Sequence, residues 1–170
     1  EEAGESYYAK QYSDFIREEL NKSGLGKGGT LIDLACGQGR IISELLSDSE
    51  IKFDKIIGVD FNANALKAAV LHLKLEDHDK KYIQLIHADI NEFLYQVEDE
   101  SIDVILLLEV LYMVPEYEEI LGIIRQKLSL KGRAFISIRS DLFLFSNFKK
   151  FCAYLILELS KKYLLKLIFL

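Results

Sequence analysis

An apolar strand that runs directly into a glycine turn and then into a helix is the feature that most constrains this fold. Leu31 to Leu34 form the apolar run, Gly37 and Gly39 follow it, and apolar residues then recur at helical spacing over 41–46. Glycine tolerates the positive φ angles of a tight turn and lets a ligand approach the backbone closely. This order predicts an α/β unit in which the amides at the start of the helix face the turn.

The same order recurs along the chain. Strands are expected at Leu31–Leu34, Lys55–Asp60, Tyr82–His87, Ser101–Leu108 and Ala134–Ile138. Helices are expected at Tyr7–Leu20, 41–46, Asn64–Leu75, Asn91–Tyr95 and from Pro115 to Leu128, with a turn at Leu130–Arg133 before the last strand. Such alternation predicts a doubly wound, mostly parallel sheet with helices on both faces, whose ligands bind beyond the carboxyl ends of the strands.

Acidic residues stand at the ends of three consecutive expected strands after the glycine turn. Asp60 ends the second strand, Asp89 follows the third and Glu109 follows the fourth. A carboxylate at the end of the second strand can accept hydrogen bonds from both hydroxyls of a ribose, and one at the next strand can accept from the exocyclic amine of an adenine. The combination predicts an edge of the sheet that binds a nucleoside.

These segments resemble the motifs of class I S-adenosylmethionine-dependent methyltransferases. The similar stretches are Ile32–Arg40, Ile57–Asp60, His87–Ile90, Ile102–Val114 and Leu128–Arg133. In order and spacing they extend over roughly Thr30 to Ile138. The resemblance implies that the fold is the class I methyltransferase fold and that S-adenosylmethionine is the cofactor.

The resemblance also implies which residues bind that cofactor. Asp33, Ala35, Gly37 and Gly39 would contact the methionine end, and Asp60 would bind the ribose. Phe61 would cover one face of the adenine, and Asp89 and the amide of Ile90 would bind the edge of the base. Leu108 and Glu109 would border the sulfonium and the acceptor.

Glu109 and Tyr112 are the candidate catalytic residues. Methyl transfer from a sulfonium needs no acid for the leaving group, so positioning and desolvation can supply most of the rate acceleration. A general base is required only where the acceptor loses a proton, and it should then lie near the end of the fourth strand. Residues that select the acceptor are expected in the N-terminal helix near Tyr8 and Tyr12, and in the C-terminal segment.

Two other functions use the same residues. A methyltransferase-like binding or scaffold module would keep the fold and the cofactor without turnover. A nicotinamide-dependent oxidoreductase is less favoured, because a dinucleotide fingerprint requires a small residue where this chain has Ile42.

Charge and composition restrict the partners. The net charge of −6 disfavours a nucleic acid, and the chain lacks the Asn-Pro-Pro-Tyr type of sequence found after the fourth strand in some methyltransferases of bases. A small molecule or a protein side chain is therefore the expected acceptor. The three histidines do not stand at metal-ligand spacing, so no metal is predicted. Two isolated cysteines, Cys36 and Cys152, favour a reducing compartment, and we expect the cytoplasm.

The C-terminal segment differs from the rest of the chain. We expect a cofactor-binding domain over 1–140 and an apolar, helical extension over 141–170, with the final hairpin of the family fold either missing or replaced. The extension carries a net charge of +3 from five lysines, one aspartate and one glutamate, and these charges interrupt it too often for a transmembrane span. Its possible roles are ordinary core helices, a cap over the acceptor, a sheet edge completed by a second copy in a homodimer, or a basic amphipathic surface for lipid.

Overall fold

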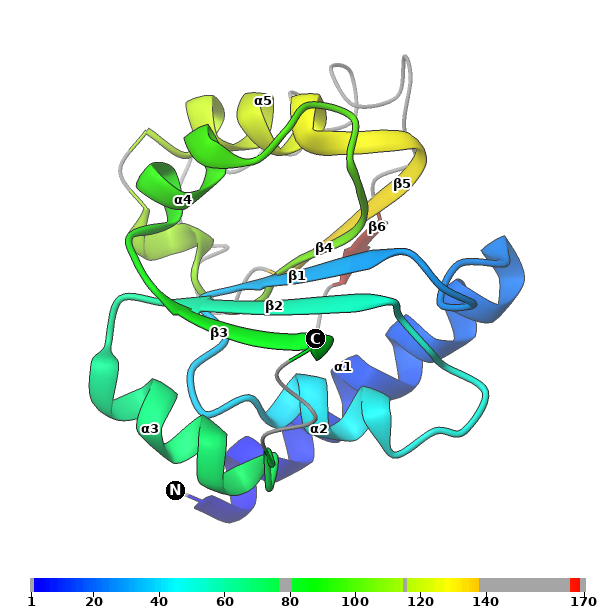
Figure 1. The fold of residues 1–170 in the computed structure, drawn as a ribbon, viewed down its shortest axis with the longest axis vertical. Helices are drawn as coiled ribbons and strands as arrows, with labels where there is room; N and C mark the ends of the chain where they lie inside the picture. The colour runs from blue at the N-terminus through cyan, green and yellow to red at the C-terminus, as the bar shows by residue number, and fades with distance from the viewer. Residues whose placement is uncertain (1, 77–80, 115, 138–165, 169–170) are drawn as a thin grey trace, which may run out of the picture.

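The sheet contains six strands within the residues that the computed structural model describes, which are 2–76, 81–114, 116–137 and 166–168. Every pair of neighbouring strands is parallel, and the order is β3-β2-β1-β4-β5-β6 (Figure 1). The strands are β1 (Thr30–Leu34), β2 (Lys55–Asp60), β3 (Ile83–His87), β4 (Ile102–Leu107), β5 (Leu128–Ser137) and β6 (Lys166–Ile168). The predicted doubly wound sheet is confirmed.

Helices cover both faces of the sheet. One layer contains α1 (Glu2–Ser23), α2 (Arg40–Leu46) and α3 (Ala63–His72), and the opposite layer contains α4 (Ile90–Gln96) and α5 (Tyr117–Lys127) (Figure 1). This arrangement follows from parallel pairing, because each right-handed crossover must place its helix on a face of the sheet.

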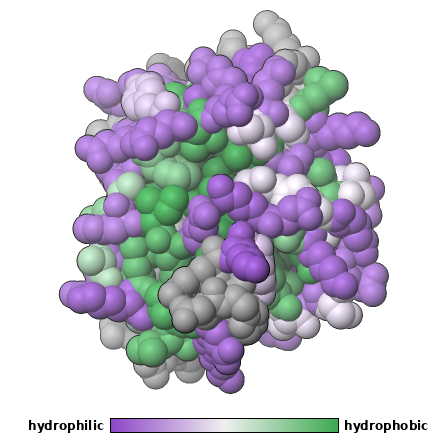
Figure 2. Space-filling model, viewed as in Figure 1, coloured by the Kyte–Doolittle hydropathy of each residue, from purple (hydrophilic) through white to green (hydrophobic). Residues whose placement is uncertain are grey.

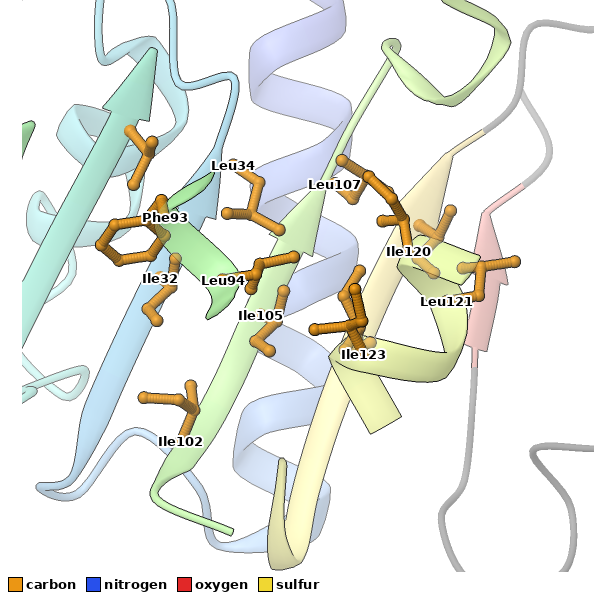
Figure 3. Close-up of a cluster of buried hydrophobic side chains, with 14 of the residues drawn as sticks. Ile32, Leu34, Phe93, Leu94, Ile102, Ile105, Leu107, Ile120, Leu121 and Ile123 are labelled. Carbon is orange, nitrogen blue, oxygen red and sulfur yellow. The ribbon is translucent and has the colours of Figure 1, made fainter. Parts of the chain in front are cut away.

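The central strand β4 is buried on both faces. Ile105 and Leu107 belong to the core beneath α4 and α5, where they pack with Phe93 and Leu94 among others (Figure 3). Val104 and Leu106 alternate with them and belong to the core on the α1 side. All four strand side chains are fully buried, which confirms the expectation drawn from the uninterrupted apolar run.

The start of β5 differs from the sequence-based expectation. Residues 130–133 were expected to form a turn, but β5 already begins at Leu128, directly after α5. Its pairing with β4 moves from Ile102↔Leu128 to Val104↔Arg133, so the extra residues form a bulge. A Cβ on Gly132 would lie 2.7 Å from the carbonyl oxygen of Ile102, which explains why glycine stands in the bulge.

The C-terminal segment is described only over β6. These three residues, Lys166–Ile168, pair in parallel with β5, so a strand stands where a helix was expected, and the helical prediction is wrong for this short stretch. The rest of the expected extension, its boundary at 140 and Pro115 lie outside the described residues.

The N-terminal helix α1 is attached to both α2 and β5. Arg17 donates hydrogen bonds to the carbonyl of Glu44 in α2 and to Ser47, which follows the end of that helix. Phe15 meets Phe135 edge to face with ring centroids 6.4 Å apart, and the buried Glu19 pairs with Arg133 at 3.5 Å. Figure 1 shows that α1 starts on the side where β2 leads into α3, which is the side of the carboxyl ends of the strands.

Seen from the side of β3, the surface has a polar rim and an apolar middle. Figure 2 shows hydrophilic side chains over the helices of both outer layers and hydrophobic side chains between them. The strongly exposed apolar residues in the described part of the chain include Phe61, which is 72% exposed at the end of β2. A ring this exposed is available to a ligand, because neighbouring side chains do not cover it.

Candidate cofactor and acceptor site

The glycine loop between β1 and α2 has an unusual backbone. Ala35, Gly37 and Gly39 have φ angles of 59°, 53° and 71°, so three of five consecutive residues adopt the left-handed region. A Cβ on Gly37 would meet no atom within 4 Å, whereas one on Gly39 would lie 3.0 Å from Leu73. Gly39 therefore lets α3 pack against the loop, and Gly37 leaves its side of the loop open.

Asp60 joins this loop to the turn after β2. Its Oδ2 accepts a hydrogen bond from the Gly37 amide at 2.8 Å, and its Oδ1 accepts one from the Asn62 amide at 2.8 Å. The Cys36 amide also donates to the carbonyl of Val59 at 3.0 Å. Asp60, the residue predicted to bind a ribose, is only 6% exposed. Its side chain already holds the backbone of two adjacent loops.

Asp33 is a buried carboxyl group near Asp60. It is 3% exposed, and no hydrogen bond or ion pair links its side chain to the residues that the structure describes. Burial in the first place, and the charge of Asp60 in the second, raise the pKa of Asp33 from 3.8 to about 7. A buried carboxylate without a partner is costly, so the position favours a ligand that brings a cation or a hydrogen-bond donor.

The end of β3 carries the residues predicted to contact a base. Asp89 caps α4, because its side chain accepts a hydrogen bond from the Asn91 amide at 2.8 Å, and Ile90 is the first residue of that helix. The carbonyl of Phe61 lies 2.8 Å from Nε2 of His87, so the loop after β2 contacts the end of β3. Phe61 and Asp89 are both exposed at this corner.

Glu109, which follows β4, is held from two other elements. Its φ is 59°, and its Oε1 accepts hydrogen bonds from the hydroxyl of Tyr12 in α1 and from Oγ of Ser137, the latter at 3.1 Å. The amide of Glu109 in turn donates to Oγ of Ser137 at 2.8 Å. No hydrogen bond to Oε2 is found from the residues that the structure describes.

The predicted residues therefore form three groups at the strand ends. Asp33, the glycine loop and Asp60 form one around β1 and β2, Phe61, Asp89 and Ile90 lie at the exposed corner by the end of β3, and Glu109 belongs to the group around β4 and β5. Leu108, directly before Glu109, is half-buried, and Tyr112 lies in the 3-10 turn Leu111–Met113, with its side chain outside the described part.

Ser137 was missed from the sequence. It is fully buried at the end of β5, and a polar residue that ends an otherwise apolar strand was the available signal. Tyr12 was expected near the acceptor, and the structure connects it to Glu109. Sequence spacing alone could not pair residues so far apart in the chain.

The described residues contain neither a membrane-spanning helix nor a cluster of metal-binding side chains. Within them, no helix combines the length and the apolar character needed to cross a membrane. The same part of the chain contains no group of three or more His, Cys, Asp and Glu side chains placed to hold a metal ion.

Comparison with known proteins identifies the family. The model of a methyltransferase domain family matches residues 25–163. The curated demethylmenaquinone methyltransferase of Lactococcus lactis is 31% identical over 124 residues, which are 73% of this chain and 47% of that protein. This chain therefore spans about half the length of the curated relative. It belongs to the class I S-adenosylmethionine-dependent methyltransferases.

Solved structures share the fold at low sequence identity. Precorrin-8w decarboxylase from Methanobacterium thermoautotrophicum has a TM-score of 0.62 and 22% identity, over 88% of this chain and 72% of that one. The trans-methyltransferase CalH, solved with S-adenosylhomocysteine, has a TM-score of 0.57 and 19% identity, over 75% of this chain and 38% of that one. The cofactor expected from the sequence, S-adenosylmethionine, is confirmed at the level of the family.

Proposed function

We propose that this domain transfers the methyl group of S-adenosylmethionine to a small-molecule acceptor. The observation that carries the proposal is the buried carboxyl of Asp33, which has no partner among the described residues and lies beside a glycine loop that Asp60 holds in place. A small molecule is favoured over a protein side chain because the curated relative is named for a quinone substrate.

The residues at the ends of β1, β2 and β3 fit the parts of this cofactor. Asp33 would bind the ammonium group, and the backbone of Ala35, Gly37 and Gly39 would contact the rest of the methionine end. Asp60 would bind the ribose, Phe61 would cover one face of the adenine, and Asp89 and Ile90 would bind the edge of the base. Asp60 can still serve the ribose, because a carboxylate offers about four lone-pair sites and only two accept backbone amides.

The acceptor would meet Leu108, Glu109 and Tyr112 at the end of β4. When bound, the cofactor supplies an electrophilic methyl group whose leaving group needs no proton. With its Oε1 held by two hydroxyl groups, Glu109 can present Oε2 to the acceptor and receive a proton from it. Tyr112 stays a second candidate for the same step.

Titration calorimetry with S-adenosylmethionine and S-adenosylhomocysteine tests the cofactor site. We expect both to bind the wild-type protein, and Asp33→Asn to weaken both at pH 8.5 by about tenfold, because an uncharged amide cannot form an ion pair with an ammonium group. Glu98→Gln is the matched control, since this exposed acid lies before the start of β4, at the opposite end of the sheet. Failure of the wild-type protein to bind either ligand would refute the proposal.

A transfer assay with methyl-labelled S-adenosylmethionine tests the activity. Demethylmenaquinone and a panel of phenols, amines and carboxylic acids are offered as acceptors, with a protein lysate as a separate sample. Labelling of a small molecule supports the proposal, and labelling of protein alone contradicts the choice of acceptor. Cofactor binding with no labelled product would favour the scaffold module, an alternative in keeping with the occurrence of this fold in a protein named as a decarboxylase.

Three further expectations stay predictions, namely the cytoplasmic location, the absence of a metal and the absence of a nucleic acid partner. A homodimer through the C-terminal segment stays one of the four alternatives for the role of that segment.

A further inference from the structure

We infer that Asp60 is a positioning residue for the methionine end of the cofactor, in addition to a ligand of its ribose. The inference rests on the proposed function for the placement of the two ends of the cofactor. Its structural basis is the pair of hydrogen bonds by which Asp60 connects the loop after β1 with the turn after β2.

The two bonds use different oxygens and reach different loops. Gly37, which donates to Oδ2, lies 23 residues before Asp60, whereas Asn62, which donates to Oδ1, lies two residues after it. Both are bonds of 2.8 Å to an ionisable group, the strong kind of backbone anchor. Together with the bond from the Cys36 amide to the Val59 carbonyl, the first bond ties the glycine loop to β2, and it is the one that holds the amide of Gly37.

The loop needs such an anchor because its backbone is intrinsically unfavourable. Ala35 adopts a φ of 59°, which is costly for a residue with a Cβ, and the glycines on either side of Gln38 adopt positive φ angles as well. A glycine loop without a tether would sample many other conformations. Asp60 thus places the Gly37 amide before the cofactor arrives.

An asparagine in place of Asp60 cannot make both bonds. The carboxylate accepts at both oxygens, but a carboxamide has one acceptor oxygen and one NH₂ group, and the latter would face one of the two amide donors. Asp60→Asn keeps the size of the side chain and removes either the bond to Gly37 or the bond to Asn62. Its effect on the loop can therefore be separated from a loss of volume.

The decisive experiment compares two ligands that share the adenosine end. S-Adenosylhomocysteine carries the amino-acid end, and 5′-methylthioadenosine lacks it. For the wild-type protein and for Asp60→Asn, calorimetry gives the ratio of the affinity for S-adenosylhomocysteine to the affinity for 5′-methylthioadenosine. At pH 8.5 Asp33 is ionised in both proteins, because its pKa is about 7 and the charge of Asp60, which the variant lacks, only raises that pKa. A loss of ribose binding weakens both ligands equally, whereas a displaced glycine loop weakens the homocysteine derivative more.

We expect Asp60→Asn to lower the affinity ratio by about tenfold, the loss that corresponds to one charge-assisted hydrogen bond. Asp89→Asn is the matched control. It alters a carboxylate at the next strand end whose bond stays within its own turn, so it should weaken both ligands and leave the ratio unchanged. Asp60→Ala has no acceptor for either amide, so an unchanged ratio in both Asp60→Asn and Asp60→Ala would overturn the inference.

Two further measurements test the conformation of the glycine loop more directly. Gly37→Ala disturbs the loop directly, because alanine is strained at a φ of 53° while its Cβ meets no atom within 4 Å, and it should lower the ratio without touching the ribose. Amide hydrogen exchange in the ligand-free protein should be faster at Gly37 in Asp60→Ala, which has no acceptor for the Gly37 amide, than in wild type. Equal exchange would overturn the inference, and this readout stands even if the proposed function fails because neither ligand binds.

Discussion

The hydroxyl of Tyr12 in α1 donates a hydrogen bond to Oε1 of Glu109, which lies 97 residues further along the chain. Ser137, at the end of β5, donates to the same oxygen at 3.1 Å. Two elements, α1 and β5, thus converge on a carboxylate that follows β4, and α1 belongs to the candidate acceptor site as well as to the core. This convergence gives a direct way to test the role of the helix.

Tyr12→Phe is expected to lower kcat for methyl transfer by about tenfold, because Glu109 loses one of the two hydroxyl groups that orient it. The affinity for S-adenosylhomocysteine should change by less than about twofold, since Tyr12 is not among the residues assigned to the cofactor. Steady-state kinetics with the acceptor identified by the panel, together with calorimetry, measure both quantities.

Tyr95→Phe is the control for Tyr12→Phe. The Tyr95 hydroxyl also donates to a glutamate, Glu119, at 2.6 Å, but this pair is exposed on α4 and α5. We expect its removal to leave kcat unchanged. Equal kcat in Tyr12→Phe and wild type would show that Glu109 does not depend on α1.

Asp33→Asn is expected to stabilise the ligand-free protein at pH 8. The pKa of Asp33 rises from 3.8 to about 7 on folding, so between these values the folded state holds a proton that the unfolded state has released. The free energy of unfolding of the wild type therefore falls as pH rises from about 4 to about 7, by at most about 4 kcal/mol.

Urea unfolding of the two proteins at pH 5 and pH 8 tests this prediction. The advantage of Asp33→Asn over the wild type should grow between the two pH values, because other titrating groups are common to both proteins and cancel in the difference. A constant difference across this range would mean that Asp33 titrates normally in the folded protein.

Two glycine substitutions are expected to act in opposite directions. A Cβ on Gly58 in β2 would lie 2.8 Å from Leu85 Cδ2 and 2.9 Å from Cys36 Sγ, so Gly58→Ala should destabilise the protein by about 1–3 kcal/mol. A Cβ on Gly122 in α5 would meet no atom within 4 Å, and alanine there should stabilise the helix by about 0.5–1 kcal/mol. Chemical denaturation measures both, and destabilisation by Gly122→Ala would contradict the packing of α5 described above.

Cys36 is expected to resist alkylation in the folded protein. Burial above all, and then the charges of Asp33 and Asp60, raise the pKa of its thiol far above the usual range, so the reactive thiolate is scarce. Mass spectrometry after iodoacetamide treatment, read at the peptide that contains Cys36, should find label only in urea. Labelling of the native protein at the rate of a free thiol would show that the strand end opens readily.

Much of the fold could be predicted because the pattern is local. The bounds of β2 were predicted to the residue, and those of β1, β3 and β4 agree within one residue at each end, since apolar runs and glycine turns mark these strands directly. The predicted turn at 130–133 was wrong because Gly132 sits in a bulge of β5, and bulges depend on contacts with the neighbouring strand.

The candidate site was predictable in composition but not in connection. The acids at the strand ends and the glycine turn are visible in the sequence, and the family of the chain follows from them. The anchoring of Gly37 by Asp60 and the convergence of Tyr12 and Ser137 on Glu109 are not visible, because each depends on which strands lie side by side.

The sequence by itself determined the alternation of strands and helices, the glycine loop between β1 and α2, and the order of the acidic residues along the sheet. Local propensity and hydrophobic periodicity are sufficient for these features. Only the tertiary structure decided that Asp33 is buried with no partner in the part of the chain that the structure describes, and that Asp60 holds two loops. Burial and hydrogen bonding between distant segments arise when the sheet closes around β1, and that closure involves the whole chain at once.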